Sequence, residues 1–265
     1  MTDQLDILLR QAPGNLALIL DFDGVLVEIA PTPDAIRVDP DLPPLLASLQ
    51  RHLGGALAVV SGRPLSEIDH YLDAAADTVF GSHGAEFRFL GETGTPPAVL
   101  AEAARRLTRF AHSALGAIPG IRVEPKPAGV AVHYRQAPDE RDRVAEMMAK
   151  AVAEAEGFEL MAGKMVFEAR IAGLHKGSAV DALMARAPFA GRMPLFIGDD
   201  VTDEDGMRAA IAHGGQGIKV GEGESVAGLR LPDPRAVHTF LRRLLPERAG
   251  QRSFSHSQDR LENTP

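Results

Sequence analysis

Cysteine is absent from this chain of 265 residues. Without thiol groups the protein forms no disulfide bonds, and any metal ion that it binds is held by oxygen or nitrogen atoms. No apolar run approaches the roughly 18 residues that a membrane-spanning helix needs. The acidic segment at residues 1–4 lacks the positive charge with which a signal peptide begins. We therefore expect a cytoplasmic protein with no membrane partner.

Positive charge is also in short supply, because 28 Lys and Arg residues stand against 36 Asp and Glu residues, for a formal net charge of −8. No basic stripe stands out, and the basic residues occur mostly among acidic ones, as on a solvated helix face. We therefore expect no nucleic-acid partner. The hydrophobic fraction of 45% and the length of 265 residues suit one large or two small domains.

Residues 17–25, ALILDFDGV, are the most informative segment that is present. The apolar start predicts a strand buried on both faces, and Asp21 and Asp23 follow it. Buried carboxylates need a cation or a proton, and Gly24 lets the chain turn sharply. Ligands bind at the carboxyl ends of strands in an open parallel sheet. The segment therefore predicts the floor of a catalytic site.

Strands and helices alternate over the first 90 residues. The expected strands are residues 16–20, 56–60 and 78–80, and the expected helices are residues 41–52 and 64–72. This alternation predicts a parallel sheet with helices on both faces. After an interruption, the same pattern returns with a helix at 177–187 and a strand at 194–197.

The interruption is expected to be a small α+β unit with an antiparallel sheet. Its expected elements, in the order helix, strand, strand, helix, strand, are 98–114, 121–124, 130–134, 139–156 and 165–169. We therefore predict a discontinuous α/β core at residues 1–95 and 173–247, an inserted unit at 96–172, and a disordered polar tail at 248–265.

A second strand that ends in carboxylates is expected at residues 195–205, LFIGDDVTDED. An Asp at a strand end often only caps the next helix, but that explanation is less satisfactory for two strands with paired acids. Carboxylate oxygens are the ligands that Mg²⁺ takes. We therefore expect Asp21 and Asp199, on neighbouring strand ends, to share this ion. Calcium is the alternative, although no Asp-rich calcium loop is present.

Two further residues could bind phosphate at these strand ends. Ser61 stands between a predicted strand and Gly62, and it can offer its hydroxyl and nearby N–H groups. A serine at such a position is more commonly a helix cap. Lys176 stands at the start of a predicted helix, where its charge opposes the helix dipole. It is either a solvated side chain or a clamp for phosphate and for Asp21.

Four segments resemble, in order, the motifs of the haloacid dehalogenase superfamily. They are DFDG at 21–24, VSGR at 60–63, Lys176, and GDDVTD at 198–203. The unit between the second and third segments resembles the larger, antiparallel-sheet cap domains of that superfamily. The resemblance implies a Rossmann-like α/β core with a parallel sheet and an inserted α+β cap domain.

A finer resemblance, over residues 15–245, is to the trehalose-6-phosphate phosphatases. The segments that carry it are GSHGAE at 81–86, VEPKP at 123–127, HYR at 133–135, GKMVFE at 163–168 and GDDVTDED at 198–205. Two features depart from the family pattern. Val25 stands where many members carry Thr or Ser, and residues 169–171 lack the proline that is common after the cap glutamate.

This resemblance implies a Mg²⁺-dependent phosphatase that hydrolyses trehalose 6-phosphate in trehalose biosynthesis. Asp21 would attack phosphorus and form an aspartyl-phosphate, and Asp23 would protonate the leaving sugar oxygen and then activate water. Their spacing of two predicts carboxylates on the same side of a strand. Ser61 and Lys176 would bind the phosphoryl group. The implied metal ligands are Asp21, Asp23, Asp199, Asp200 and Asp203.

The resemblance also implies a set of substrate-binding residues, namely Arg63, His83, Glu124, Lys126 and Glu168. The last three lie in the predicted cap domain and would hydrogen-bond to sugar hydroxyls, although the residues alone suggest only a solvated strand face. Cap closure would exclude water.

Several alternative functions stay open at this point. One is another capped sugar phosphatase, acting on sucrose phosphate or mannosylglycerate phosphate, and a second is a phosphomutase. A third is a non-catalytic sugar-phosphate sensor or a subunit of a synthase complex. The expected partners are a sugar phosphate and, through functional coupling, a trehalose-6-phosphate synthase.

Overall fold

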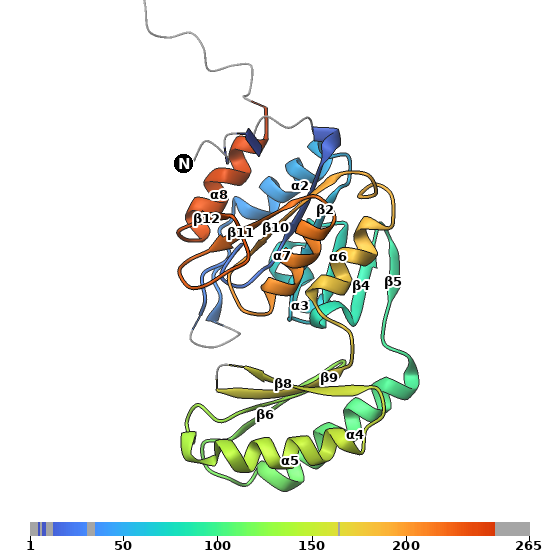
Figure 1. Cartoon of the computed structure of the whole chain (residues 1–265), viewed down its shortest axis with the longest axis vertical. Helices are drawn as coiled ribbons and strands as arrows, with labels where there is room; N and C mark the ends of the chain where they lie inside the picture. The colour runs from blue at the N-terminus through green and yellow to red at the C-terminus, as the bar shows by residue number, and fades with distance from the viewer. Residues whose placement is uncertain (1–4, 6, 9–12, 31–34, 164, 247–265) are drawn as a thin grey trace, which may run out of the picture.

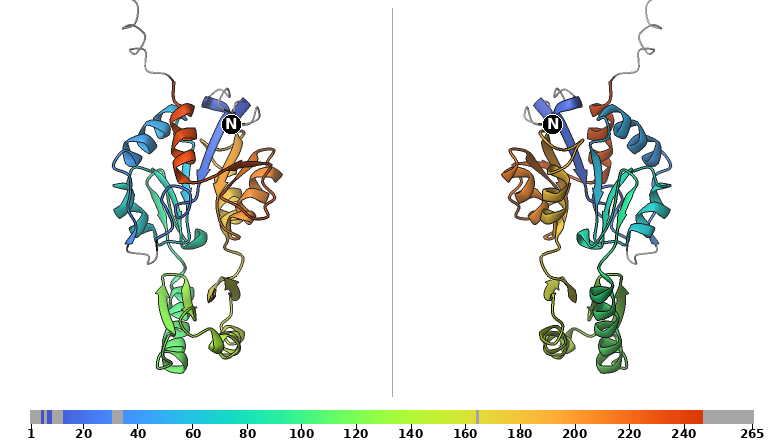
Figure 2. Two further views of the ribbon diagram at one scale, coloured as in Figure 1. Left: turned by 90° about the vertical axis from the view of Figure 1, so that its left-hand side faces the viewer. Right: turned by 90° about the vertical axis from the view of Figure 1, so that its right-hand side faces the viewer.

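The computed structural model describes residues 5, 7–8, 13–30, 35–163 and 165–246. They form two parts that lie end to end along the longest axis of the molecule (Figures 1 and 2). The predicted tail at 248–265 and Lys164 of the GKMVFE segment lie outside the described residues. No helix among the described residues has the length and apolar character needed to cross a membrane.

The larger part is built on an eight-stranded sheet in the order β12-β11-β10-β1-β2-β3-β4-β5. The pairs from β12 to β3 are parallel, and β4 and β5 join them antiparallel. The strands are β1 (Leu16–Leu20), β2 (Leu57–Val60), β3 (Thr78–Gly81), β4 (Glu86–Phe89), β5 (Glu92–Gly94), β10 (Met193–Gly198), β11 (Gln216–Val220) and β12 (Leu229–Leu231). The predicted parallel sheet is confirmed.

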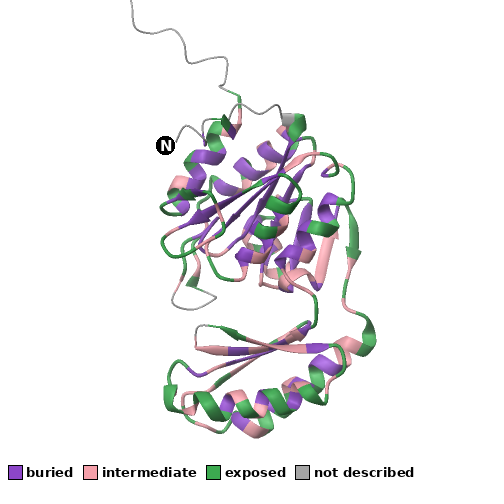
Figure 3. Ribbon diagram, in the orientation of Figure 1, coloured by how far each residue is buried: buried purple, intermediate pink, exposed green. Residues whose placement is uncertain are grey.

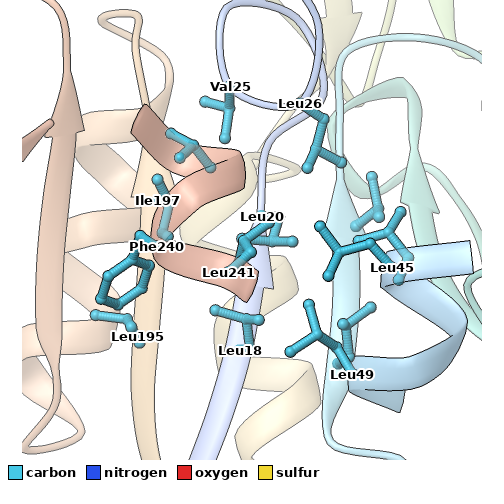
Figure 4. Packing of buried hydrophobic residues seen from close by; sticks show 14 of the residues in the cluster. Leu18, Leu20, Val25, Leu26, Leu45, Leu49, Leu195, Ile197, Phe240 and Leu241 are labelled. Atoms are coloured by element: carbon cyan, nitrogen blue, oxygen red, sulfur yellow. The ribbon is translucent and has the colours of Figure 1, made fainter. Parts of the chain in front are cut away.

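Helices cover both faces of this sheet, as predicted. Successive side chains of a strand point to opposite faces, so a strand that is apolar throughout needs cover on both. Leu18 and Leu20 of β1 pack with α2 (Leu42–His52), α3 (Leu65–Leu72) and α8 (Pro234–Leu244) (Figure 4). Ile19 packs on the other face with α6 (Lys176–Met184) and α7 (Asp203–Ala212). The prediction for α6 was too long, since this helix ends at Met184.

The smaller part is a four-stranded antiparallel sheet in the order β6-β7-β9-β8. Its elements are α4 (Ala98–Leu115), β6 (Arg122–Lys126), β7 (Gly129–His133), η4 (Pro138–Glu140), α5 (Arg141–Ala153), β8 (Phe158–Gly163) and β9 (Val166–Ile171). The α+β unit is confirmed, but β8 was missed and the helix predicted to residue 156 was too long. α5 already ends at Ala153, and Gly157, with a φ of +82°, lies in the turn that leads into β8.

Each part has its own hydrophobic core, and two connections join them (Figures 2 and 3). One connection lies between β5 and α4, and the other between β9 and α6. The predicted limits of the inserted unit, residues 96 and 172, fall in these connections and stay predictions. We call the smaller part the cap and the larger part the core.

Candidate active site

Asp21 follows β1 directly, at the centre of the large sheet. β1 pairs with β10 on one side and with β2 on the other, and the Asp21 N–H donates to the carbonyl of Ile197 at 3.0 Å. Asp21 is only 4% exposed. β1 ends at Leu20, so Asp21 and Asp23 both lie beyond the strand and do not occupy successive same-side positions on it.

Lys176 is the buried cation beside Asp21. It opens α6, which His175 caps by accepting a hydrogen bond from the Ser178 N–H at 3.2 Å. The Lys176 Nζ lies 2.8 Å from Asp21 Oδ1 and 2.5 Å from Asp203 Oδ1. Burial by itself lowers the pKa of Lys176, but Asp203 and Asp21 raise it overall above its ordinary value. These two carboxylates hold a charged lysine at a position that the helix dipole disfavours.

Asp203 organises the loop that carries Asp199. Its Oδ2 accepts the backbone N–H groups of Asp199 and Asp200, both at 3.0 Å, while its Oδ1 binds Lys176. Space for the Asp199 carboxylate depends on Gly24, where a Cβ atom would lie 2.2 Å from Asp199 Oδ2. Glycine is therefore required for this close approach, and its φ of +72° suits the turn as well.

The residues at this edge suit a divalent cation with oxygen ligands. Ligand atoms of Asp21, Asp199 and Asp203 all lie within 4.8 Å of one another. Burial, with the charge of Asp203 next, raises the pKa of Asp21 well above its usual range and that of Asp199 to about 7. Burial and the neighbouring Asp203 both disfavour the charged forms of these carboxylates, and a cation bound there would offset that cost. Carboxylate oxygens are the ligands that Mg²⁺ takes.

Asp200, also predicted as a metal ligand, is placed differently. Its side chain is outside this group, and its Oδ1 accepts the backbone N–H of Val201 at 2.7 Å. The residue is exposed. The structure thus brings Asp21, Asp199 and Asp203 together and leaves the Asp200 carboxylate at the rim.

Asp23 is held by Arg63. The Nε and Nη2 atoms of Arg63 bind the two Asp23 oxygens at 2.7 and 3.0 Å, and its Nη1 binds Glu67 at 2.8 Å. The guanidinium carbon also lies 5.7 Å from the ring centre of Phe22 and 5.5 Å from that of Tyr71. Arg63, predicted to bind substrate, is therefore engaged with Asp23 in this geometry.

Ser61 and His83 meet where β2 and β3 end. Ser61 is 1% exposed, its Oγ accepts the Arg63 N–H at 3.2 Å, and its carbonyl accepts the His83 N–H at 3.0 Å. His83 has a φ of +58°, which is uncommon for a residue other than glycine. Its ring covers Gly62, where a Cβ atom would come within 2.7 Å of the ring.

The side chain of His83 extends from the core toward the cap. Its Nε2 lies 4.0 Å from Glu168 Oε2 on β9. Burial lowers the pKa of His83 to about 3, and the charges of Lys176 and Lys126 act in the same direction. Its Nδ1 is buried without a hydrogen-bond partner among the described residues. A neutral imidazole with an unused ring nitrogen can bind a hydroxyl group of a ligand.

Glu124 and Lys126 lie on β6 of the cap sheet. Glu124 Oε2 is 2.7 Å from His133 Nε2, and Glu124 Oε1 is 3.7 Å from Lys126 Nζ. The hydrogen bond with His133 is the main cause that lowers the pKa of Glu124 to about 2. A small cavity at the junction is lined from the core by Ser82, Ala85 and Leu174 and from the cap by Lys126, Glu168 and Arg170.

Sequence reasoning missed Lys219 and gave no role to Glu86 of the GSHGAE segment. Lys219 of β11 is 5% exposed, and its Nζ donates to the backbone carbonyl of Asp199. A lysine inside the apolar run GIKV was the available signal, because a buried cation needs a partner. Glu86 accepts hydrogen bonds from the Ser82 Oγ and the Leu65 N–H, both at 3.1 Å. Only the folded chain brings these partners together.

Known proteins resemble the chain over most of its length. The family model for trehalose-phosphatase matches residues 19–228. A probable trehalose-phosphate phosphatase of Sinorhizobium fredii is 41% identical over 213 residues, which are 78% of each chain. The trehalose-6-phosphate phosphatase of Escherichia coli K12 is 34% identical over 93% of this chain and 92% of its own.

A solved structure agrees with these sequence matches. The crystal structure of a trehalose-6-phosphate phosphatase related protein has a TM-score of 0.71 and 28% identity, over 86% of this chain and 95% of that chain. The agreement includes both the core and the cap. On the family model and these relatives, the chain belongs to the trehalose-phosphatase family.

Proposed function

We propose that this chain hydrolyses trehalose 6-phosphate to trehalose and phosphate with Mg²⁺ as cofactor. The observation that carries the proposal is the buried contact of Lys176 with Asp21 and Asp203, with Asp199 beside it. Such a group offers a nucleophile, a fixed positive charge and oxygen ligands at one strand edge. Family membership supports the substrate, since relatives from two bacteria are named for it.

Asp21 is the proposed nucleophile. Its carboxylate attacks phosphorus as the bond from phosphorus to the sugar oxygen breaks, which leaves an aspartyl-phosphate. Water then attacks that phosphorus, so that phosphate leaves and the carboxylate is restored. Lys176 and the Ser61 hydroxyl bind the phosphoryl oxygens through both displacements. Mg²⁺, when held by Asp21 and Asp199, supplies charge that neutralises these oxygens.

Three further acidic residues support this edge in the proposal. Asp203 orients Lys176 and the loop of Asp199 through its three hydrogen bonds. Supporting groups of this kind tune metal sites. Asp200 and the backbone carbonyl of Asp23 complete the predicted ligand set, and they stay predictions.

Asp23 is the proposed acid and base. It donates a proton to the leaving sugar oxygen and later takes one from the attacking water. Arg63 binds both of its oxygens, and in the proposal this pair separates when Asp23 carries the proton to the sugar oxygen. Arg63 would then be available to bind the substrate.

The cap supplies the proposed sugar specificity. Glu124, Lys126 and Glu168 stand on its sheet, and His83 reaches Glu168 from the core. Closure of the cap onto the core would surround the sugar and exclude competing water. A synthase that makes trehalose 6-phosphate is the enzyme to which this activity would be functionally coupled.

A phosphate-release assay tests the proposal. Purified protein is given trehalose 6-phosphate, sucrose 6-phosphate, mannosylglycerate phosphate or glucose 6-phosphate, with Mg²⁺ or with EDTA. We expect Mg²⁺-dependent release, with the highest kcat/KM for trehalose 6-phosphate. Equal turnover of glucose 6-phosphate would contradict the specificity, and isomerised sugar phosphate without free phosphate would indicate a phosphomutase.

A further inference from the structure

Arg170 lies on the face of the cap sheet that is turned toward the core. Its neighbours on β9, Ala169 and Ile171, pack into the hydrophobic cluster with α4 and α5. Because side chains alternate along a strand, Arg170 and Glu168 point to the opposite face. Figure 1 shows that the sheet lies between its helices and the core. Sequence reasoning assigned no role to Arg170, although it stands two residues after a predicted sugar-binding glutamate.

The strand register places Arg170 in a row that crosses all four strands of the cap sheet. Lys126 of β6 is opposite Gly129 of β7, Gly129 is opposite Arg170, and Arg170 is opposite Glu159 of β8. The Arg170 Nε donates to Glu159 Oε1 at 2.8 Å. The side chain of Arg170 is 11% exposed, and that of Glu159 is 38% exposed. Glu159, on an edge strand, therefore holds the guanidinium in place.

The guanidinium of Arg170 has unused donors. An arginine carries five N–H donors, and the hydrogen bond with Glu159 uses the one on Nε. The structure shows no hydrogen-bond partner among the described residues for the two terminal nitrogens. A largely buried charged group with unused donors favours a hydrogen-bond acceptor beside it.

Arg170 lines the small cavity at the junction of the cap and the core. Lys126 and Glu168 line it from the same face of the cap sheet, and Ser82 lines it from the core. The rest of the lining is apolar and consists of Ala85, Ala128, Ile171 and Leu174. Apolar walls with a few polar groups are typical of ligand sites. Two cationic donors and one carboxylate acceptor suit a hydroxyl group, which both accepts and donates hydrogen bonds.

His83 shows that this cavity adjoins the catalytic edge of the core. Its N–H donates to the Ser61 carbonyl at 3.0 Å, and its Nε2 lies 4.0 Å from Glu168. Burial is the main cause that lowers the pKa of His83, and the positive charge of Arg170 is among the further causes. The guanidinium is therefore near this ring. A sugar whose phosphate lies at Ser61 and Lys176 has the cavity beside it.

We propose that Arg170 is a specificity-determining residue that donates a hydrogen bond to a hydroxyl group of the sugar, with Glu159 holding its guanidinium in place. The proposal rests on the proposed function, in which Lys126 and Glu168 bind the same sugar. The phosphoryl chemistry does not depend on Arg170, because the nucleophile and the buried lysine stand on the core.

Two substrates separate sugar binding from phosphate binding. Arg170→Met keeps the apolar part of the side chain and removes its donors. It is compared with wild type on trehalose 6-phosphate and on p-nitrophenyl phosphate, a phosphate ester without a sugar. We expect the KM for trehalose 6-phosphate to rise about tenfold or more, because a hydrogen bond from a charged donor is lost. The kcat/KM for p-nitrophenyl phosphate should stay within about twofold of wild type, because its hydrolysis uses only the core residues.

Two further variants show whether the position of the arginine is responsible. Arg170→Gln is uncharged and shorter, so it should also raise the KM, and it serves if Arg170→Met does not fold, as judged by thermal unfolding. Arg143→Met is the matched control, because Arg143 is a cap arginine on α5 that is 59% exposed and lies 3.6 Å from Glu140. It should leave the KM for trehalose 6-phosphate unchanged.

The outcomes that overturn the proposal are distinct from failure of the proposed function. An unchanged KM for trehalose 6-phosphate in a folded Arg170→Met or Arg170→Gln variant overturns the proposal. An equal loss on both substrates overturns it as well, because Arg170 would then act on the phosphate group or on the shape of the site. If wild type hydrolyses p-nitrophenyl phosphate but not trehalose 6-phosphate, the proposed function fails instead. The KM of the sugar phosphate that wild type prefers then decides the proposal on Arg170.

Discussion

Charged side chains line both sides of the junction, but the core and the cap hold them in different ways. In the core, Lys176 contacts Asp21 and Asp203 at 2.8 and 2.5 Å, with side chains at most 6% exposed. In the cap, Lys126 and Glu124 lie 3.7 Å apart and are 19% and 27% exposed. Loss of one partner from a buried group leaves an uncompensated charge, whereas water screens the exposed pair.

This difference separates chemistry from recognition. A phosphoryl group needs reacting atoms at defined positions, which a buried, close ion-pair group provides. A sugar needs several hydrogen-bond partners, which partly exposed residues can offer after small movements. Changes in the core should therefore affect catalysis and stability strongly, and changes in the cap should affect KM with modest effects on stability.

Asp21→Asn is expected to have the largest effect. It removes the nucleophile and retains the shape of the side chain, so kcat for trehalose 6-phosphate should fall by about 10⁴-fold or more. Phosphate release under saturating Mg²⁺ measures it. Asp205→Asn is the matched control, because the Asp205 side chain binds Arg208, at 3.0 Å on the surface of α7. Comparable activity of Asp21→Asn and wild type would remove Asp21 from its proposed role.

Asp203→Asn should have the next largest effect, on stability. The change removes the Asp203 carboxylate from Lys176 and leaves the contact with Asp21, in a site where the Asp203 side chain is 0% exposed. Breaking a buried ion pair costs about 3 kcal/mol or more. Urea unfolding in EDTA measures the free energy of unfolding without any metal contribution.

Asp200→Asn serves as the control for that comparison. Asp200 is exposed, and its recorded contact is with the N–H of the next residue. A surface change of this kind should alter the free energy of unfolding by no more than about 0.5 kcal/mol. If Asp203→Asn and Asp200→Asn lowered the free energy of unfolding equally, the buried contact of Asp203 with Lys176 would not contribute more to stability than the exposed Asp200.

The core site was easier to predict from sequence than the contacts across it. Parallel strands end at one edge of a sheet, so the positions of Asp21, Ser61 and Asp199 followed from three apolar runs. The pairing of Asp23 with Arg63 did not follow, because 40 residues separate them and side-chain direction decides the contact. The prediction that Asp21 and Asp23 lie on the same side of a strand was also wrong, because β1 ends at Leu20, before both residues.

The cap shows the same division between pattern and contact. Its α+β character followed from the order of helical and strand-like segments, but β8 was missed and the helix was extended to residue 156, although α5 ends at Ala153. The turn between α5 and β8, which contains Gly157 at a positive φ, is not revealed by sequence periodicity alone. The placement of Glu124 and Glu168 on the same face of the cap sheet, each opposite Ala131, needed the observed register, since a shift of one residue would reverse the faces.

Two lysines, one in the core and one in the cap, give a further test. Lys219 donates to the carbonyl of Asp199, so Lys219→Met should weaken Mg²⁺ binding by about tenfold, as loss of a supporting group does. Lys126→Met removes a cap lysine near Glu124. It should leave Mg²⁺ affinity unchanged and raise the KM for trehalose 6-phosphate.

Isothermal titration with Mg²⁺ and steady-state kinetics at saturating Mg²⁺ distinguish these two expectations. Thermal unfolding without metal checks that both variants are folded, because Lys219 is buried. If Lys126→Met weakened Mg²⁺ binding as much as Lys219→Met, the metal would not depend on the core alone. The separation between chemistry and recognition would then be wrong.

The smallest expected effect is a pH dependence in the cap. The pKa of Glu124 falls from 4.5 to about 2 on folding, mainly through the hydrogen bond with His133. A lowered folded-state pKa stabilises the ionised form, so the contribution is complete above about pH 4.5. It is lost as the pH falls through about 2. Because solvent screens this half-buried pair, we expect about 1 kcal/mol at most.

Glu124→Gln measures this contribution. The difference in free energy of unfolding between wild type and Glu124→Gln should be constant above about pH 5 and vanish near pH 2, because only the ionised carboxylate is favoured by folding. In a His133→Ala background the same substitution should have a smaller effect, since the main cause of the shift is gone. A difference that grew toward low pH would reverse the sign of the argument. If Glu124→Gln instead changed the free energy of unfolding by several kcal/mol, Glu124 would behave like the buried charged residues of the core. The contrast between a buried core group and a solvent-screened cap pair would then be wrong for this residue.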